Sequence, residues 1–387
     1  MHEVGLCMIV KDEAHVIARC LQSVRPLIDY WTIVDTGSTD GTQDLIRELL
    51  DGVPGHLFER PWINFGHNRS EALELARPHA RYTFVIDADE ILEVPSGFVW
   101  GDLTADSVYL LHRGSTASDT TYWRGSLVAN RLPWCYRGVL HEYLEAPGSS
   151  TIAHLAGPEV VGHFDGGRSQ NITTREKYAR DAAVLEQALV DEPDNARYQY
   201  YLARSYRDSD QIELAIEAYR RRARMGAFAE EVSDSLLWVA RLLERQGADV
   251  PDVEAAYLQA WQARPQRAEA LVDLARYSRC GGRFALGRMV AAQAVLIERP
   301  DDLLWVEEDV YRWRALDELA VAAFWVGRYT ESLEACRRLL TEGHLPQEQR
   351  DRVVQNYAFA AEKLGLPKSA FEAVPRPRPQ ETLNTPA

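Results

Sequence analysis

The chain has 387 residues, 46% of them hydrophobic and 26% charged, which is enough apolar material for two or three folded domains. Its 43 basic and 58 acidic residues give a net charge of −15, which argues against a general binder of nucleic acid or of anionic membranes. Five scattered cysteines without a C-x-x-C spacing predict neither a disulfide framework nor a zinc site. No apolar run reaches the length of a signal peptide or membrane span, so a cytoplasmic protein is expected.

The sequence pattern changes near residue 166. Residues 4–165 alternate short β-like runs with helical patterns, whereas residues 168–365 carry almost no strand signal. Glycines at 162, 166 and 167 interrupt the pattern between these two parts. We therefore predict a first domain of residues 1–166, a helical domain of residues 167–366 and a proline-rich tail of residues 367–387.

The first domain opens with two predicted strands, Val4–Val10 and Trp31–Asp35. The second strand ends on a carboxylate and runs directly into the turn TGSTDGT, where Gly37 permits a tight turn and Ser38 or Thr39 can cap the next helix. A carboxylate beside a helix N-terminus predicts a nucleotide site, and a capped βα turn without a ligand is the alternative. The absence of G-x-G-x-x-G and Walker sequences disfavours dinucleotide and P-loop sites.

The stretch FVIDADEIL, residues 84–92, places three carboxylates at the end of an apolar run. The run predicts a buried parallel strand, and ligands of open α/β sheets bind beyond the carboxyl ends of such strands. Asp87 and Asp89 would repel each other there, so the pattern predicts a bound cation, with a solvated acidic turn as the alternative. Arg69, at the start of a predicted helix, either reaches a diphosphate or is a surface residue.

Four motifs in this order and spacing resemble family 2 glycosyltransferases of the GT-A fold: LCMIVKDEAHVIARCLQSV, VDTGSTDGT, WINFGHNRSEAL and FVIDADEIL. The resemblance covers about residues 4–166 and implies an α/β, Rossmann-like domain that binds a nucleotide sugar. The second half of the chain resembles the tetratricopeptide arrays that some members carry, including the peptide S-glycosyltransferases of glycopeptide bacteriocins. The expected fold is thus a GT-A domain followed by an all-α array of helical repeats.

The resemblance also implies roles for single residues. It places the nucleotide sugar at Val10, Lys11, Glu13, Asp35, Gly37, Ser38, Arg69, Asp87 and Ala88. It assigns the base to Asp35, the ribose or metal to Asp87 and the divalent ion to Asp89, with Glu90 orienting them. Since carboxylate oxygens prefer hard cations, we expect Mn²⁺ or Mg²⁺ to neutralise the diphosphate of a UDP- or GDP-linked sugar.

Three later residues would complete a reaction centre. His141 and Glu142 form a polar pair that interrupts an otherwise apolar predicted strand, and similar enzymes carry such a pair near the acceptor. Glu142 is the preferred general base for an inverting displacement, and His141 is the alternative. His163 lies where GT-A enzymes often supply a C-terminal metal ligand, although a structural, hydrogen-bonded histidine is the alternative.

The helical half shows a degenerate repeat. Ala203, Ala240, Ala275 and Ala320 are small residues in similar contexts, separated by 37, 35 and 45 residues. Repeats of roughly 34 residues stack into a superhelix, because each unit buries a face against its neighbours. The best single match is Gly327–Ala335, where a glycine and an aromatic residue allow paired helices to pack closely.

The predicted function is a metal-dependent glycosyltransferase. Because donor chemistry does not need a helical array, we expect the array to deliver a peptide or protein acceptor, or to form a homodimer. A carbohydrate or lipid-linked glycan is the alternative acceptor, and the net charge disfavours DNA. The intact carboxylates count against a non-catalytic repeat adaptor, and the missing glycine-rich, lysine-containing signature counts against a nucleotidyltransferase.

Overall fold

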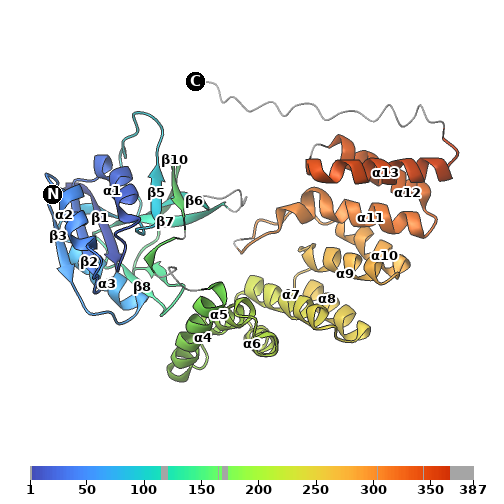
Figure 1. Ribbon diagram of the computed structural model, residues 1–387, viewed down its shortest axis with the longest axis horizontal. Coiled ribbons are helices and arrows are strands. Elements are labelled where there is room, and N and C mark those ends of the chain that lie inside the picture. The colour runs from blue at the N-terminus through green and yellow to red at the C-terminus, as the bar shows by residue number, and fades with distance from the viewer. Residues whose placement is uncertain are drawn as a thin grey trace. The chain divides into compact units, whose positions relative to one another are not determined.

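The computed structural model describes residues 2–114, 121–163, 165–167, 173–302, 304–342 and 344–366, in two compact units (Figure 1). The first unit ends at Pro193 and the second begins at Asp194. The first is α/β and the second is all-α, which confirms the predicted fold classes. Helix α4 (Thr174–Asp191) is grouped with the first unit, whereas the sequence assigned it to the helical domain, so the boundary after residue 166 stays a prediction. The predicted tail, residues 367–387, lies outside the described residues.

An eight-stranded sheet, in the order β3-β2-β1-β4-β7-β6-β10-β5, forms the first unit. Its strands are β1 (His2–Val10), β2 (Tyr30–Asp35), β3 (Gly55–Glu59), β4 (Ala80–Val85), β5 (Glu90–Glu93), β6 (Ser107–Gly114), β7 (Thr121–Ala129) and β10 (Ile152–Gly162). Strands β3, β2, β1 and β4 are parallel, with Val10 beside Asp35, whereas β7 runs antiparallel to β4 and β6. The carboxyl ends of β2, β1 and β4 therefore meet at one edge. A separate hairpin contains β8 (Cys135–Arg137) and β9 (Tyr143–Glu145).

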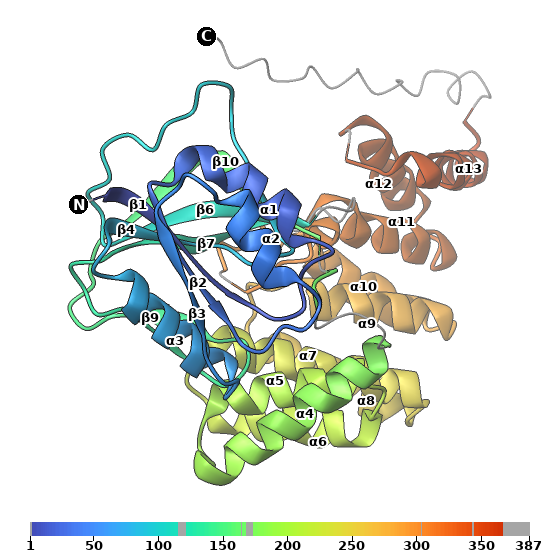
Figure 2. The same ribbon diagram turned by 60° about the vertical axis from the view of Figure 1, so that its left-hand side comes forward.

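Helices cover both faces of the parallel strands (Figure 2). They are α1 (Ile17–Val24), continued by the 3₁₀ turn η1 (Arg25–Leu27), α2 (Thr42–Leu49) and α3 (Phe65–Ala76). Since successive strand residues face opposite sides, Leu6 packs with Leu21 of α1 in one core while Cys7 packs with Leu73 of α3 in another. This sandwich buries β1 on both faces and holds its carboxyl end rigidly at the sheet edge.

The second unit is a stack of helix pairs. Its elements are α5 (Ala196–Asp208), α6 (Ile212–Met225), α7 (Ala229–Gln246), α8 (Val250–Ala263), α9 (Glu269–Cys280), α10 (Phe284–Ala294), the π-helical segment η3 (Val310–Arg314), α11 (Ala315–Trp325), α12 (Tyr329–Thr341) and α13 (Gln347–Lys363). The four repeat alanines are all buried, each in the first helix of its pair. Connections from α5 to α10 and from α11 to α13 have three to five residues, but residues 295–309 join α10 to η3. This insertion explains the 45-residue spacing.

Across the described residues, no helix combines the length and apolar character that crossing a membrane requires, as the sequence predicted.

Candidate active site

Asp35 ends β2 at the sheet edge and is 1% exposed. Its Oδ1 accepts hydrogen bonds from the backbone amides of Gly37 at 2.7 Å and Ser38 at 2.8 Å. Its Oδ2 is buried and has no hydrogen-bond partner among the described residues. Leaving a buried carboxylate oxygen unsatisfied is costly, so this atom is suited to accept an N–H from a ligand. Because Asp35 occupies both amides, a ligand contact at Gly37 or Ser38 would use other atoms.

The loop that follows β1 is joined to the loop that follows β2. The backbone amide of Asp12 donates to Ser38 Oγ at 2.9 Å, and that of Glu13 donates to Thr42 Oγ1 at 2.8 Å. The prediction that Ser38 or Thr39 caps α2 is wrong. Gly41, at a φ of 93°, occupies the N-cap position, and no side chain caps the helix there. Ser38 instead fixes the first loop against the second.

Asp87 lies in the turn between β4 and β5, where two arginines approach it. Arg69 Nη2 is 2.6 Å from Asp87 Oδ1, and Arg124 Nη2 is 3.7 Å from Asp87 Oδ2. Burial would raise the pKa of Asp87, but the charges of Arg69 and Arg124 outweigh it and hold that pKa below its usual range. Arg69 also places Nε 2.7 Å from Glu142 Oε1, so one guanidinium bridges the carboxylates of Asp87 and Glu142. Its side chain is only 11% exposed, so the surface alternative for Arg69 is excluded.

Arg124, on β7, is a site residue that the sequence analysis missed. Its Nη1 lies 3.3 Å from Oε1 of the buried Glu90, whose Oε2 accepts the backbone amide of Asp87 at 2.9 Å. Glu90 therefore holds the Asp87 turn in the way the sequence predicted. The only sequence signal for Arg124 is a single cation within the strand TYWRGSLVA.

Glu142 and His141 lie in a tight loop between β8 and β9. The sequence predicted one continuous strand here, but Gly138 (φ 110°) and His141 (φ 52°) take left-handed conformations that break it. The loop also touches the start of α3: a Cβ added at Gly66 would lie 2.2 Å from the carbonyl oxygen of Gly138. This close approach sets Glu142 beside Arg69 on α3.

Asp89 and Glu13 form the acidic side of the site. The backbone amide of Gly166 donates to Asp89 Oδ2 at 3.3 Å, and that of Gly167 donates to Glu13 Oε2 at 3.0 Å. Neither carboxylate forms an ion pair within the described ranges. Burial, together with the charges of Asp87 and Glu90, raises the pKa of Asp89. Burial raises the pKa of Glu13 to about 7, although the hydrogen bond from the Gly167 amide acts to lower it. The charge of Asp89 adds to the rise.

Two of the three predicted metal ligands, Asp89 and His163, are neighbours in the structure. The backbone amide of His163 donates to the carbonyl oxygen of Asp89 at 3.1 Å, which puts these two residues side by side. In the parts of the chain that the structure describes, no three His, Cys, Asp or Glu side chains are arranged to hold a metal ion. The set of Asp87, Asp89 and His163 therefore stays a prediction.

Three other predicted donor-site residues surround this edge. Val10 and Ala88 are buried in the core beneath it, and Lys11 is exposed at the end of β1. The carbonyl oxygen of Val10 accepts the amide of Thr36 at 2.9 Å, which ties β1 to the turn after β2. Val10 and Ala88 therefore support the backbone of this edge through core packing and, at Val10, a backbone hydrogen bond.

The parallel strands of the sheet have carboxylates and an arginine beside their carboxyl edge, and the chain continues into helical repeats. Residues 6–94 match the profile of Glycosyl transferase family 2. The first unit thus contains a family 2 glycosyltransferase domain, and the protein is a glycosyltransferase, as the four motifs predicted.

Known proteins resemble both parts of the chain. The chain is 27% identical over 318 residues to a TPR repeat-containing protein of Synechococcus elongatus. The aligned region covers 76% of this chain and 75% of that protein. The chain is also 34% identical over 88 residues to the lipopolysaccharide core biosynthesis glycosyltransferase LpsC of Rhizobium meliloti, 22% of this chain and 31% of that protein.

Solved structures show weaker likeness. TarS of S. aureus, residues 1–349 with UDP-GlcNAc, is 12% identical with a TM-score of 0.38 and covers 66% of this chain and 92% of its own. MamA is 16% identical with a TM-score of 0.33 and covers 51% of this chain and 87% of its own. Because these TM-scores are low, the assignment to the glycosyltransferases depends on the family profile and the sequence relatives.

Proposed function

We propose that this glycosyltransferase moves a sugar from a UDP- or GDP-linked donor to a peptide or protein side chain, using a divalent metal ion and an inverting displacement. One observation carries the proposal. Three features lie at a single sheet edge: the buried oxygen of Asp35 that has no hydrogen-bond partner among the described residues, the bridge from Asp87 through Arg69 to Glu142, and the carboxylates of Asp89 and Glu13, which form no ion pair with any described residue.

The donor would be recognised first at Asp35. Its free Oδ2 can accept the ring N–H of a uracil or guanine base, which satisfies the buried oxygen. Arg69 pairs with Asp87 through Nη2 and with Glu142 through Nε, so its positive charge lies beside the carboxylates where we place the diphosphate. The same arginine would therefore orient the diphosphate and the general base.

Asp89 and Glu13 are our candidates for holding a divalent metal ion beside the donor. Asp89 and Glu13 offer oxygen atoms without an ion-pair partner in the described ranges. Burial raises the pKa of both carboxyl groups, and the charges of neighbouring carboxylates add to the rise. Asp89 would hold the ion, with Glu13 and the adjacent His163 as further candidates. When bound, Mn²⁺ or Mg²⁺ would neutralise the departing nucleoside diphosphate.

Glu142 would act on the acceptor. Its carboxylate removes the proton of the acceptor group as that group attacks the anomeric carbon from the side opposite the diphosphate, which inverts the configuration. Arg69 holds Glu142 in place through the 2.7 Å contact, and the left-handed turn at His141 presents the loop. His141, next to it in that loop, is the alternative base.

Product analysis with a donor panel tests the reaction. The full chain would be incubated with UDP- and GDP-linked sugars and Mn²⁺, and with EDTA as control. We expect release of UDP or GDP that EDTA abolishes, and NMR should show the inverted anomer. In a parallel incubation with a nucleoside triphosphate and a sugar phosphate, release of pyrophosphate would indicate a nucleotidyltransferase. Absence of both turnover and donor binding would support the non-catalytic adaptor.

The acceptor class needs a separate experiment. The name of the LpsC relative favours the alternative acceptor, a carbohydrate or lipid-linked glycan. Mass spectrometry of peptide and glycan pools after incubation with labelled donor separates these outcomes. A chain ending at Pro193, where the first unit ends, should still hydrolyse donor slowly but lose transfer to a peptide acceptor. Full-length rates from the shorter chain would contradict delivery by the array.

A further inference from the structure

Strand β7 extends past the end of its neighbour β4 at the edge of the sheet where the candidate site lies. Residues 82–84 of β4 pair with residues 127–129 of β7, and the two strands are antiparallel. The earlier residues of β7, from Tyr122 to Gly125, therefore lie beyond the carboxyl end of β4 and pair there with β6. The contact between Arg124 and Asp87 shows that this extension borders the site.

Two exposed aromatic residues on this extension face opposite sides of the sheet. Successive residues of a strand point to opposite faces, so Tyr122 shares a face with Arg124 and Trp123 does not. Trp123 packs instead on the other face, with its ring 4.9 Å from that of His154 on β10. Tyr122 is 44% exposed and Trp123 is 42% exposed. Of these two accessible rings, only that of Tyr122 lies on the face of the site.

The ring of Tyr122 rests on a buried histidine. His112, directly opposite on β6, is 2% exposed, and the two rings stack with centroids 5.5 Å apart. The imidazole has a polar neighbour at each nitrogen: Nε2 lies 2.9 Å from Ser126 Oγ, and Nδ1 lies 3.7 Å from Glu90 Oε1. These contacts fix the plane of the imidazole, so Tyr122 has a rigid support that leads back to the residue holding the Asp87 turn.

The phenol of Tyr122 also lies close to the charges of the site. Burial raises the pKa of Tyr122, the charge of Arg124 and a hydrogen bond to it act to lower that pKa, and the charges of Glu90 and Asp87 raise it. Single exposed aromatic residues are common and need no function. Tyr122 differs from such residues because its ring is stacked on a buried polar side chain beside the carboxylates of the candidate site.

The order of the strands gives the direction in which a donor would extend. Asp35 ends β2, Asp87 follows β4 and Tyr122 lies on β7, in the strand order β2-β1-β4-β7. Neighbouring strands are separated by about 4.8 Å, so β7 lies roughly 14 Å from β2 across the sheet. A donor with its base at Asp35 and its diphosphate beside Asp87 would carry its sugar onward to β7.

We propose that Tyr122 is a specificity-determining residue, which stacks its ring against the sugar of the nucleotide-sugar donor. The proposal rests on the proposed function, in which the donor binds along this edge. An aromatic ring offers a flat apolar surface that complements the C–H face of a sugar ring, while the sugar hydroxyls are left to polar groups around it. Tyr122 would thus favour sugars that present an unbroken apolar face.

Binding measurements separate the sugar from the rest of the donor. Isothermal titration calorimetry of the full chain with Mn²⁺ would use UDP, GDP, UDP-glucose, UDP-N-acetylglucosamine and GDP-mannose. The tightest nucleotide sugar and its parent diphosphate are then compared in variants. Tyr122→Leu keeps an apolar side chain against His112 but removes the flat ring. We expect it to weaken nucleotide-sugar binding at least ~10-fold and to leave diphosphate binding within about 2-fold.

Two matched variants serve as controls. Tyr122→Phe keeps the ring and should bind both ligands as the unmodified chain does. Trp123→Leu removes an equally exposed ring from the opposite face and should change neither affinity. Thermal unfolding establishes that each variant is folded, and Tyr122→Met replaces the leucine variant if that one is not.

The outcomes distinguish failure of this assignment from failure of the proposed function. Equal loss of nucleotide sugar and diphosphate in Tyr122→Leu, or loss of neither, overturns the assignment of Tyr122 alone. The same holds if Tyr122→Phe or Trp123→Leu weakens nucleotide-sugar binding as much as Tyr122→Leu does. An unmodified chain that binds none of these nucleotides refutes the proposed donor, and the assignment of Tyr122 with it.

Discussion

Replacing Arg69 with methionine should destabilise the first unit, because this side chain bridges two carboxylates. Arg69 is 11% exposed and Glu142 is 13% exposed, so the substitution leaves Glu142 shielded from water without its ion-pair partner. Breaking a buried ion pair costs about 3–5 kcal/mol. Asp87 keeps Arg124 at 3.7 Å and is 29% exposed, so we expect the lower end, about 3 kcal/mol. Methionine preserves the unbranched stem and the packing around it.

Buried cysteines allow each unit to be followed separately in the full chain. Cys20 is buried in the first unit and Cys336 in the second, and both are 0% exposed. Pulsed alkylation across a urea gradient, read by mass spectrometry, gives the unfolding of each. A loss of about 3 kcal/mol raises the opening equilibrium at Cys20 on the order of 100-fold. Labelling at Cys336 should not change.

Arg60→Met is the matched control, because Arg60 pairs with Glu71 at 2.7 Å with both side chains about one-third exposed. An exposed pair of this kind is worth about 0–1 kcal/mol. Adding Glu142→Gln to Arg69→Met should recover part of the lost stability, since the stranded charge is removed. If Arg69→Met costs no more than Arg60→Met, the bridge does not stabilise the site and the reasoning is refuted.

Three further substitutions test the site. Asp89→Asn should abolish metal-dependent transfer without loss of stability, since it removes a charge that other carboxylates repel; near-normal turnover with Mn²⁺ would contradict the metal assignment. Glu142→Gln should lower the transfer rate by about 10²-fold while donor binding persists in a thermal-shift assay, and an unchanged rate would favour His141. The pKa of Glu13 is about 7 in the folded state, above its usual 4.5. Between these two pH values the folded state binds more protons than the unfolded state, so the free energy of unfolding falls as pH rises through this window. Glu13→Gln should flatten that decline in urea titrations, and equal slopes in both proteins would show that Glu13 does not cause it.

Local patterns predicted the elements around the donor edge well. The strands ending at Val10 and Asp35 and the helix that carries Arg69 follow from apolar runs and turn residues that lie close together in the sequence. The position of Asp87 beyond a buried strand also follows, because a parallel strand ends at a shared edge. Each of these inferences uses information within about ten residues of the feature.

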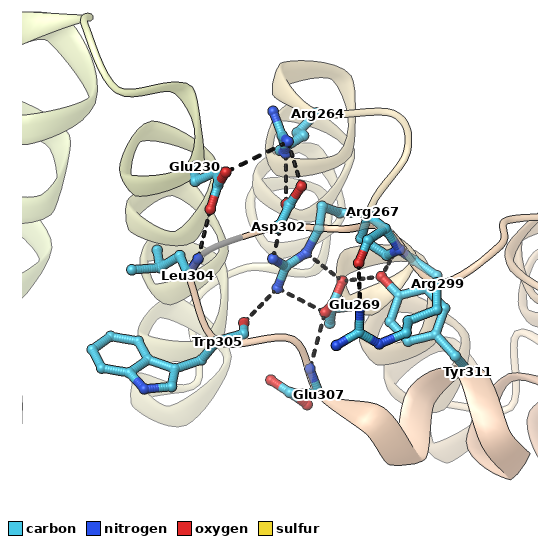
Figure 3. Close-up of polar contacts among 12 residues, drawn as sticks. Glu230, Arg264, Arg267, Glu269, Arg299, Asp302, Leu304, Trp305, Glu307 and Tyr311 are labelled. Atoms are coloured by element: carbon cyan, nitrogen blue, oxygen red, sulfur yellow. Dashed lines mark hydrogen bonds and ion pairs between the residues drawn. The ribbon is translucent and has the colours of Figure 1, made fainter. Parts of the chain in front are cut away.

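Contacts between distant segments were not predictable in the same way. Arg124 meets Asp87 only because β7 lies antiparallel beside β4, and no local pattern states which strands pair. The loop at Glu142 was expected to be a strand because its apolar residues outweighed Gly138, whose left-handed conformation decides the turn. The 45-residue spacing before Ala320 signalled an insertion, but the course of that insertion depends on arginines contributed by other repeats (Figure 3).

The close approach of Gly66 and Gly138 packs the start of α3 directly against the loop that carries Glu142. No side chain separates the start of α3 from the loop that carries Glu142, so neither can shift without the other. The guanidinium of Arg69 and the carboxylate of Glu142 are consequently preorganised before any substrate arrives, and little reorganisation energy is spent at the moment of reaction. In the mechanism we propose, acceptors would then be selected by their shape, because the loop is packed against the helix.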